Sequence, residues 1–178
     1  TDGQGTAESA ISAATDAVGG PQAITIGHTD SSNTRTLFDD QSLVFVSSEM
    51  NTTTITMSSG RLEALSEDLS FTHVELNTAN YDHGISISDV VLQLRDIVGL
   101  STLDGKQKIA ADIDGDGEVA ISDVVSNLRH IVGLDTIEEC ALVDSTDALV
   151  TSLNSSNIAD LTLVQYGDVD LSATFLIT

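Results

Sequence analysis

The carboxylates in the stretch DIDGDGEVAISD, residues 112–123, have the spacing of a cation-binding loop. They occupy positions 1, 3, 5 and 12 of the stretch, as Asp112, Asp114, Asp116 and Asp123. Alternating side chains in a tight loop direct their oxygens inward, and a glycine at position 6, Gly117, permits the sharp turn. Oxygens at this spacing suit Ca²⁺, a hard cation that takes six to eight such ligands. The sequence therefore predicts a calcium site in this stretch, which we call loop 2.

Two further positions of loop 2 bear on its ligands. Glu118, at position 7, is expected to contribute its backbone carbonyl. Position 12 is Asp123, where a bidentate Glu is usual, so this shorter carboxylate must lie closer to the ion. The alternative interpretation of the stretch is an acidic turn at the surface.

An internal repeat predicts a second, weaker loop. ISISDVVLQLRDIVGL (85–100) matches VAISDVVSNLRHIVGL (119–134) at eleven of sixteen positions, with an offset of 34 residues. The same offset places loop 1 over 78–89, where position 1 is Thr78 and position 6 is His83. With two carboxylates and two neutral side-chain positions, loop 1 should bind calcium more weakly. Its predicted ligands, with Gly84 acting through its carbonyl, are Asn80, Asp82, Gly84, Ser86 and Asp89.

Other acids leave alternatives open. Loop 1 could take a ligand from upstream, such as Asn77 or Glu75, or it could be a degenerate loop kept for its shape. A separate hypothesis assigns further calcium ions, at junctions between modules, to Asp144, Asp147, Asp168 and Asp170.

Each predicted loop leads into a helix. Ser and Asp precede the apolar pattern in both repeats, as a helix start requires, and Gly99 and Gly133 stand where a helix C-terminal glycine belongs. We expect one flanking helix for each loop, and we expect the apolar faces of the two helices to pack together. These faces are Val90, Leu94, Ile97 and Val98 in the first repeat, and Val124, Leu128, Ile131 and Val132 in the second.

The flanking segments predict strands. AITIGH, TRTLF, SLVFVSS, TTTITMS and LSFTHVEL precede the repeat, and ALVTSL, LTLVQY and DLSATFLI follow it; all are short and bounded by turn-forming residues. The later group offers about three strands, too few for an independent β domain. The expected fold class is therefore α+β, with a β-sandwich formed by 1–77 and 139–178 and split by an inserted helical calcium module over 78–138.

Composition excludes several classes of function. The chain has 28 Asp and Glu against 6 Lys and Arg, and a net charge of −22 opposes binding to nucleic acid or to an anionic membrane. The four histidines share no metal-ligand spacing, and no nucleophile elbow or acid–base pair stands outside the calcium loops. Cys140, the single cysteine, is expected to be a buried structural thiol. We therefore expect a monomer that is not an enzyme and has no membrane insertion.

The paired loops and helices resemble the duplicated repeat of dockerin domains. The likeness covers about 78–138 and rests on D-x-D-G-D-G-x-x-x-x-x-D followed by D-V-V-x-x-L-R-x-I-V-G-L. In dockerins, loop positions 10 and 11 contact a β-sandwich partner called cohesin; here these positions are Ile87–Ser88 and Ile121–Ser122. The resemblance implies bound Ca²⁺, loops without an entering helix, and a cohesin-like protein domain as a partner.

The flanks have a second resemblance. GDVDLSATF (167–175), the strand-rich segments and the acidity are similar to modules of large RTX-type bacterial surface adhesins. This implies an extracellular module, at the cell surface or secreted, in which calcium folds and rigidifies one link of a tether between neighbouring modules. In that interpretation the Ile87 and Ile121 face packs on the β part. The alternatives are a dockerin that binds a cohesin-like partner in trans, and an accessory domain of a secreted glycoside hydrolase.

Overall fold

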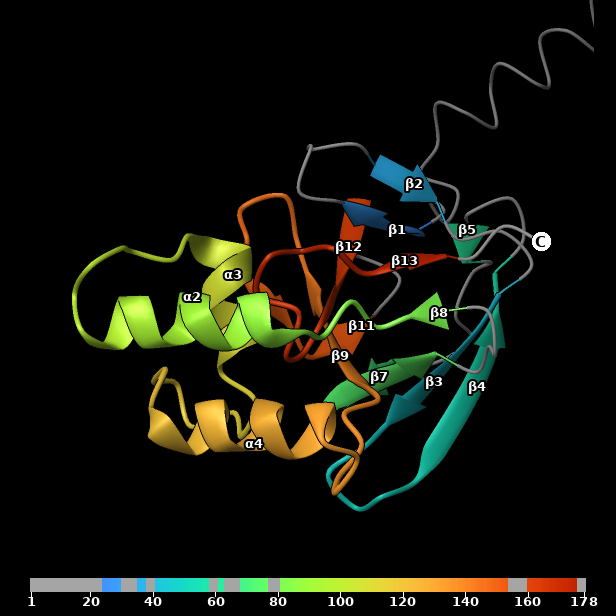
Figure 1. The fold of residues 1–178 in the computed structure, drawn as a ribbon. Coiled ribbons are helices and arrows are strands. Elements are labelled where there is room, and N and C mark those ends of the chain that lie inside the picture. The colour runs from blue at the N-terminus through green and yellow to red at the C-terminus, as the bar shows by residue number, and fades with distance from the viewer. Residues whose placement is uncertain are drawn as a thin grey trace, which may run out of the picture.

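The computed structural model describes residues 24–29, 35–37, 41–57, 61–62, 68–76, 81–153 and 160–175. Over these residues the fold is α+β and mostly β: a curved, barrel-like sheet with three short helices gathered on one side (Figure 1). This confirms the expected fold class at that level. None of the described helices has the length and apolar character needed to cross a bilayer.

The main sheet combines strands from both ends of the chain. Its order is β2-β1-β12-β9-β7-β3-β4, with β10 also paired to β9 and β5 to β1. β1 pairs with β12 in parallel and β7 pairs with β9 antiparallel, so segments on either side of the helices form one sheet. The strands of this sheet are β1 (Ile24–Thr29), β2 (Arg35–Leu37), β3 (Ser42–Val46), β4 (Thr52–Thr56), β5 (Arg61–Leu62), β7 (His73–Leu76), β9 (Glu139–Val143), β10 (Leu149–Val150) and β12 (Asp160–Gln165).

Strand β9, which no strand prediction covered, lies at the centre of the sheet and is buried on both faces. Its alternate residues Cys140 and Leu142 enter the main core, while Ala141 and Val143 pack against Ala110 on the other side. Such a strand shows a continuous apolar run in place of alternation, which makes it hard to identify from sequence.

The helices are α2 (Ile87–Ile97), α3 (Gly105–Ala111) and α4 (Ile121–Ile131). α2 and α4 lie side by side, and α3 lies above α2 in the view of Figure 1. Gly99 and Gly133 adopt φ values of 71° and 74° directly after the C-caps of α2 and α4, and this confirms the predicted helix ends. α3 was not expected. Because it directly precedes residue 112, loop 2 has a helix on each side, and the expectation of one flanking helix is wrong for this loop.

The predicted apolar faces of α2 and α4 are mostly not core. Val90 and Val124 are buried, but Leu94, Val98, Leu128, Ile131 and Val132 are exposed, so the expectation that these faces pack together is wrong for most of their residues. The buried residues of each helix are instead Asp89, Val90 and Gln93 in α2, and Asp123, Val124 and Asn127 in α4.

The chain after β12 crosses from the sheet to the helices. Val169 is fully buried against Leu103 and Ala111, and this joins the C-terminal segment to the helical part. The segment ends in β13 (Thr174–Phe175), which pairs with β8 (Tyr81–Asp82) just before α2. A further short pair joins β6 (Leu69–Ser70) to β11 (Ser152–Leu153).

Candidate metal centre

Loop 2 gathers three carboxylates around one point. Asp112, Asp114 and Asp116 each offer an oxygen, and these oxygens lie within 4.8 Å of one another. The loop's own amides fix them: Asp116 N–H and Gly117 N–H donate to the two oxygens of Asp112 at 3.1 and 2.9 Å. Positive φ values of 71° at Gly115 and 91° at Gly117 produce the tight turn that aligns these donors.

Asp123 closes loop 2 from the first turn of α4. Its side chain is fully buried; Oδ1 accepts Ile113 N–H at 2.8 Å and Oδ2 accepts Ala120 N–H at 2.8 Å. This carboxylate therefore connects both ends of the loop. Burial raises the pKa of Asp112, and the negative charge of Asp123 adds to that shift. A bound cation would relieve both effects. The side chain of Glu118 is exposed, in keeping with a role for its carbonyl alone.

The predicted loop 1 residues do not all come together. Asn80 lies outside the described residues. Asp82 is exposed on β8, where its Oδ1 accepts Gly84 N–H at 3.0 Å, and it belongs to neither group of clustered acids. Ser86 is the N-cap of α2 and forms a capping box with Asp89. Asp89 is the one predicted carboxylate of loop 1 that joins a cluster.

That second cluster contains Asp89, Asp168 and Asp170, whose oxygens also lie within 4.8 Å of one another. Asp89 and Asp168 are buried, and burial raises the pKa of both; for Asp168 it reaches about 7, with the charge of Asp89 as a further cause. Asp168 and Asp170 were predicted as separate junction ligands, and their meeting with Asp89 was missed. A usable signal existed, because GDVD (167–170) repeats the D-x-D spacing of Asp112 and Asp114.

The other predicted junction acids are held by local contacts. Asp144 Oδ1 accepts the N–H groups of Thr146 and Ala148 at 2.7 and 3.1 Å, and its hydrogen bonds to Thr146 lower its pKa. Asp147 pairs with Lys106 Nζ at 2.8 Å. Neither residue belongs to a clustered group within the part of the chain that the structure describes.

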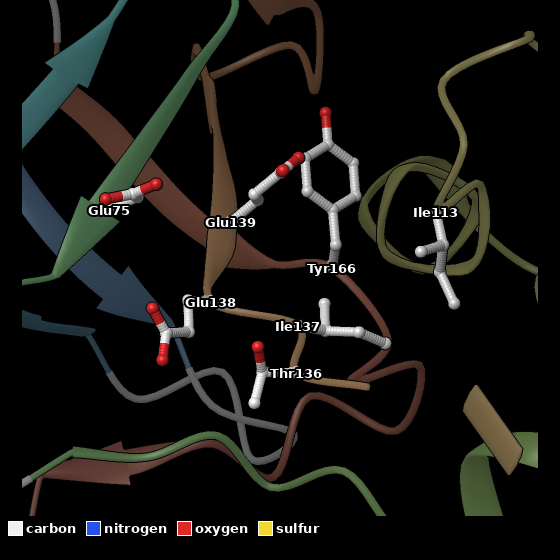
Figure 2. Close-up of a pocket in the computed structure, with 7 residues that line it drawn as sticks. All are labelled: Glu75, Ile113, Thr136, Ile137, Glu138, Glu139 and Tyr166. Carbon is white, nitrogen blue, oxygen red and sulfur yellow. The ribbon is translucent and has the colours of Figure 1, made fainter. Parts of the chain in front are cut away.

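A pocket of about 260 Å³ opens beside loop 2 (Figure 2). Three glutamates line it, one on β7, one at the start of β9 and one just before that strand, and Tyr166 lies beside Glu139 (Figure 2). Burial and the charge of Asp112 raise the pKa of Tyr166 to about 12. The glutamates form no clustered metal group among the described residues. The lining residues are Glu75, Ile113, Thr136, Ile137, Glu138, Glu139 and Tyr166.

The cysteine and two histidines make structural contacts. Cys140 is fully buried, its Sγ donates to Gln165 Oε1 at 3.2 Å, and burial raises its pKa, which confirms the prediction of an inert buried thiol. His83 Nδ1 lies 2.8 Å from the same Gln165 oxygen. His130 Nδ1 accepts Ile137 N–H at 3.0 Å, so this nitrogen carries no proton.

Comparison of the chain with protein families, with curated proteins and with solved structures gave no match. The geometry of the two acidic clusters therefore carries the functional argument.

Proposed function

We propose that this chain is a non-enzymatic calcium-binding module. The observation that carries the proposal is the convergence of Asp112, Asp114 and Asp116 within 4.8 Å, on a loop whose amides already orient them. The donor set consists of oxygens alone, with no imidazole or thiolate among them. Such a set favours Ca²⁺, Mg²⁺ or Mn²⁺ over zinc or copper. The open, multidentate layout suits the larger, more flexibly coordinated calcium.

Calcium acts here by linkage between binding and folding. The loop brings three like charges together, and Asp123 adds a fourth nearby, so the folded form without an ion carries electrostatic repulsion. An ion that binds the folded form alone stabilises it by RT ln(1 + [Ca]/Kd), about 2.7 kcal/mol when free calcium is about 100 times Kd. Calcium therefore stiffens the helical part and the sheet against which α3 packs.

The wider setting follows the resemblances of the sequence. We propose a dockerin-like calcium module inserted in a β-sandwich that 1–77 and 139–178 form together, as one link in a large extracellular bacterial adhesin. The pairing of β1 with β12 and of β7 with β9 supports the split arrangement, because it joins strands from both flanks of the helices. The net charge of −22 suits a setting rich in divalent cations.

The test is a calorimetric melt of the whole chain in millimolar calcium and again in EDTA. Calcium should raise Tm by about 5 to 10 °C in a chain of this size. Asp116→Asn should remove the share of that shift that comes from loop 2, since it deletes a ligand charge; it keeps an oxygen for Glu118 N–H, which limits harm to folding. Asp68→Asn, the same change at an exposed site on the β part, is the matched control. Equal melting with and without calcium would contradict the proposal.

A second candidate function is docking of a protein partner, and a specific observation favours it. Ile87 and Ile121, expected to pack on the β part, are instead 61% and 55% exposed, so that expectation is wrong. They lie among the exposed apolar residues of α2 and α4, which we call together the α2/α4 face, and exposed apolar patches mark interaction sites. The face consists of Ile87, Val91, Leu94, Val98, Ile121, Val125, Leu128, Ile131 and Val132.

The resemblance to dockerins names the partner to test, a cohesin-like β domain. In this candidate function, a panel of purified cohesin domains titrated into the calcium-loaded chain gives at least one saturable complex. Val91→Asp and Val125→Asp should abolish that complex, because a buried unpaired carboxylate is costly. The Asp68→Asn control should bind as the parent chain does. Absence of binding across the panel would leave the stiffening function as the better proposal.

A further inference from the structure

We propose that a second calcium ion binds in a loop assembled from two distant segments, with residues 168–173 as its first half and residues 84–89 as its second. We call this the composite loop. The inference rests on the proposed function in one respect, namely that calcium is the ion this chain takes. It replaces the continuous loop over 78–89 that the sequence repeat predicts.

The first half of the composite loop repeats the hydrogen bonding of loop 2. Asp168 accepts N–H groups from Ser172 and Ala173, four and five residues further on, both at 2.8 Å. Asp112 accepts N–H groups from Asp116 and Gly117, also four and five residues further on, at 3.1 and 2.9 Å. The two carboxylates therefore occupy the same place, position 1, in equivalent turns.

The backbone of this half matches loop 2 at position 4. Leu171 has a φ of 57°, a conformation that disfavours a side chain, and it stands where loop 2 has Gly115 with a φ of 71°. A non-glycine residue is held in this region only when its surroundings require it. The equivalence assigns Asp170 to position 3, which Asp114 occupies in loop 2, and Ser172 to position 5, which Asp116 occupies there.

The second half closes the composite loop as Asp123 closes loop 2. Asp89 Oδ2 accepts Ser86 N–H at 2.8 Å, and Asp123 Oδ2 accepts Ala120 N–H at 2.8 Å. Asp89 Oδ1 accepts Asp170 N–H at 2.9 Å, where Asp123 Oδ1 accepts Asp114 N–H at 3.3 Å. The bond between Asp89 and Asp170 spans 81 residues of sequence, so positions 12 and 3 of the composite loop meet although they are far apart along the chain.

The two halves approach closely at Gly84, which stands at position 7. Its carbonyl accepts a hydrogen bond from Ser172 Oγ at 3.2 Å, so the expected ligands of positions 5 and 7 lie together. A Cβ on Gly84 would lie 2.5 Å from Ala173 N and 2.9 Å from an oxygen of Asp168. A glycine at this position therefore allows the halves to form one loop.

Burial without a counter-charge indicates that this cluster takes a cation. Asp89 and Asp168 are 0% and 1% exposed, and the ion pairs of the described residues lie elsewhere, on Lys106, Arg129 and His73. In addition, Asp170 Oδ1 is a buried oxygen that accepts no hydrogen bond. Buried carboxylates are costly unless paired, and an oxygen without a donor is a free ligand for an ion.

The consequence is a calcium-dependent fastening of the chain's last segment. An ion held by Asp89, Asp168 and Asp170 joins α2 to the strand-and-turn segment that follows β12, and it stabilises the pairing of β13 with β8. Calcium at loop 2 tightens the helical part internally, whereas calcium in the composite loop ties the helical part to the sheet.

Calorimetric titration with CaCl₂ tests the composite loop through the number of ions bound. The parent chain should bind two ions, and Asp170→Asn should bind one. This variant is chosen because it keeps the bond from the backbone N–H of Asp170 to Asp89, which limits harm to folding. Asp116→Asn should also bind one ion, and the double variant none. Asp82→Asn distinguishes the composite loop from the continuous loop over 78–89, because Asp82 is a ligand only in the continuous loop. Asp68→Asn is the charge-matched control, and both variants should bind two ions.

The outcomes separate this inference from the proposed function. If Asp82→Asn loses an ion while Asp170→Asn keeps both, the composite loop is overturned and the continuous loop is correct. If the parent chain binds one ion that Asp116→Asn removes, the composite loop is overturned while the proposed function stands. Calcium should also slow hydrogen exchange of the amides of residues 168–173 at least tenfold in the parent chain and not in Asp170→Asn. Equal protection in both would overturn the composite loop.

Discussion

Gln93 and Asn127 hydrogen-bond to each other between α2 and α4, with Asn127 Nδ2 donating to Gln93 Oε1 at 3.0 Å. Both side chains are fully buried, and they are equivalent residues of the repeat, 34 positions apart. Each also reaches beyond the helix pair: Gln93 Nε2 donates to Ala111 O at 2.9 Å, and Asn127 Nδ2 donates to Gly167 O at 3.1 Å. This polar pair connects α2, α3, α4 and the C-terminal segment at one point.

Asn127→Ala should therefore destabilise the chain by more than the small size of the deleted amide group would suggest. The change leaves Gln93 Oε1 and Gly167 O without their donor, at about 1 to 3 kcal/mol for a buried unsatisfied group. We expect a loss of about 2 to 4 kcal/mol in the free energy of unfolding, measured by urea denaturation in calcium. Ser126→Ala, on the same helix, removes only a bond to Ser122 O and should change stability by less than about 0.5 kcal/mol. Similar losses in the two variants would show that the pair contributes nothing specific.

Cys140 should resist thiol reagents while the chain is folded. It is fully buried on the central strand β9, and its raised pKa keeps it protonated. We expect negligible reaction with a disulfide reagent at about pH 8, where free thiols react readily, and one equivalent of reaction after denaturation in urea. Cys140→Ala, which has no thiol, is the control for background reaction of the reagent. Fast stoichiometric reaction of the folded chain would place this thiol at the surface.

His130 should make the chain less stable in mild acid. Burial lowers its pKa from 6.5, with the charge of His83 as a second cause, so the folded state binds fewer protons than the unfolded state. The free energy of unfolding therefore falls as pH drops below 6.5. Protonation of His130 Nδ1 would also break its bond from Ile137 N–H.

The measurement compares urea denaturation at about pH 7.5 and about pH 5.5, in saturating calcium, for the parent chain and His130→Asn. Saturating calcium keeps the clustered carboxylates ionised, so that their titration does not obscure the histidine. The variant should lose less stability than the parent between the two pH values. Equal losses would assign the acid sensitivity to other groups.

Local features of this fold were predictable from sequence, and long-range ones were not. Loop 2 and the glycine ends of α2 and α4 depend on residues a few positions apart, and they were found. α3 has a capping box between Asp104 and Gln107, a signal that was present but not used. The meeting of Asp89 with Asp168 is different, because a repeat in sequence predicts a continuous loop and only the fold shows which segment supplies its first half.

The exposed α2/α4 face was misread for another physical reason. An apolar stripe at helical spacing predicts burial, but it does not say what covers the stripe. The repeat buries a polar residue in each helix, Gln93 and Asn127, and leaves Leu94 and Leu128 at the surface. A side chain that satisfies backbone carbonyls at depth can replace an apolar contact, and hydrophobicity patterns do not detect this.

Alanine substitutions at Gly84 and Gly99, compared with each other, test the close approach of the two halves of the composite loop. Both have a φ of 71°, so Gly→Ala carries the same backbone cost of about 1 kcal/mol at each. The surroundings differ: a Cβ at Gly99 meets nothing within 4 Å, whereas one at Gly84 meets Ala173 N at 2.5 Å. Gly84→Ala should therefore lose about 2 kcal/mol more than Gly99→Ala in urea denaturation with calcium present.

The two glycine variants should differ in calcium affinity as they differ in stability. Gly84→Ala would place a Cβ 2.9 Å from an oxygen of Asp168 and so displace this ligand; it should weaken the binding of one of the two expected ions at least tenfold and leave loop 2 unchanged. Gly99→Ala should bind both ions as the parent chain does, because Gly99 only ends α2. If Gly84→Ala lowered stability but left both affinities intact, the close contact at Gly84 would serve packing alone, and the ligands of the composite loop would have to be sought away from it.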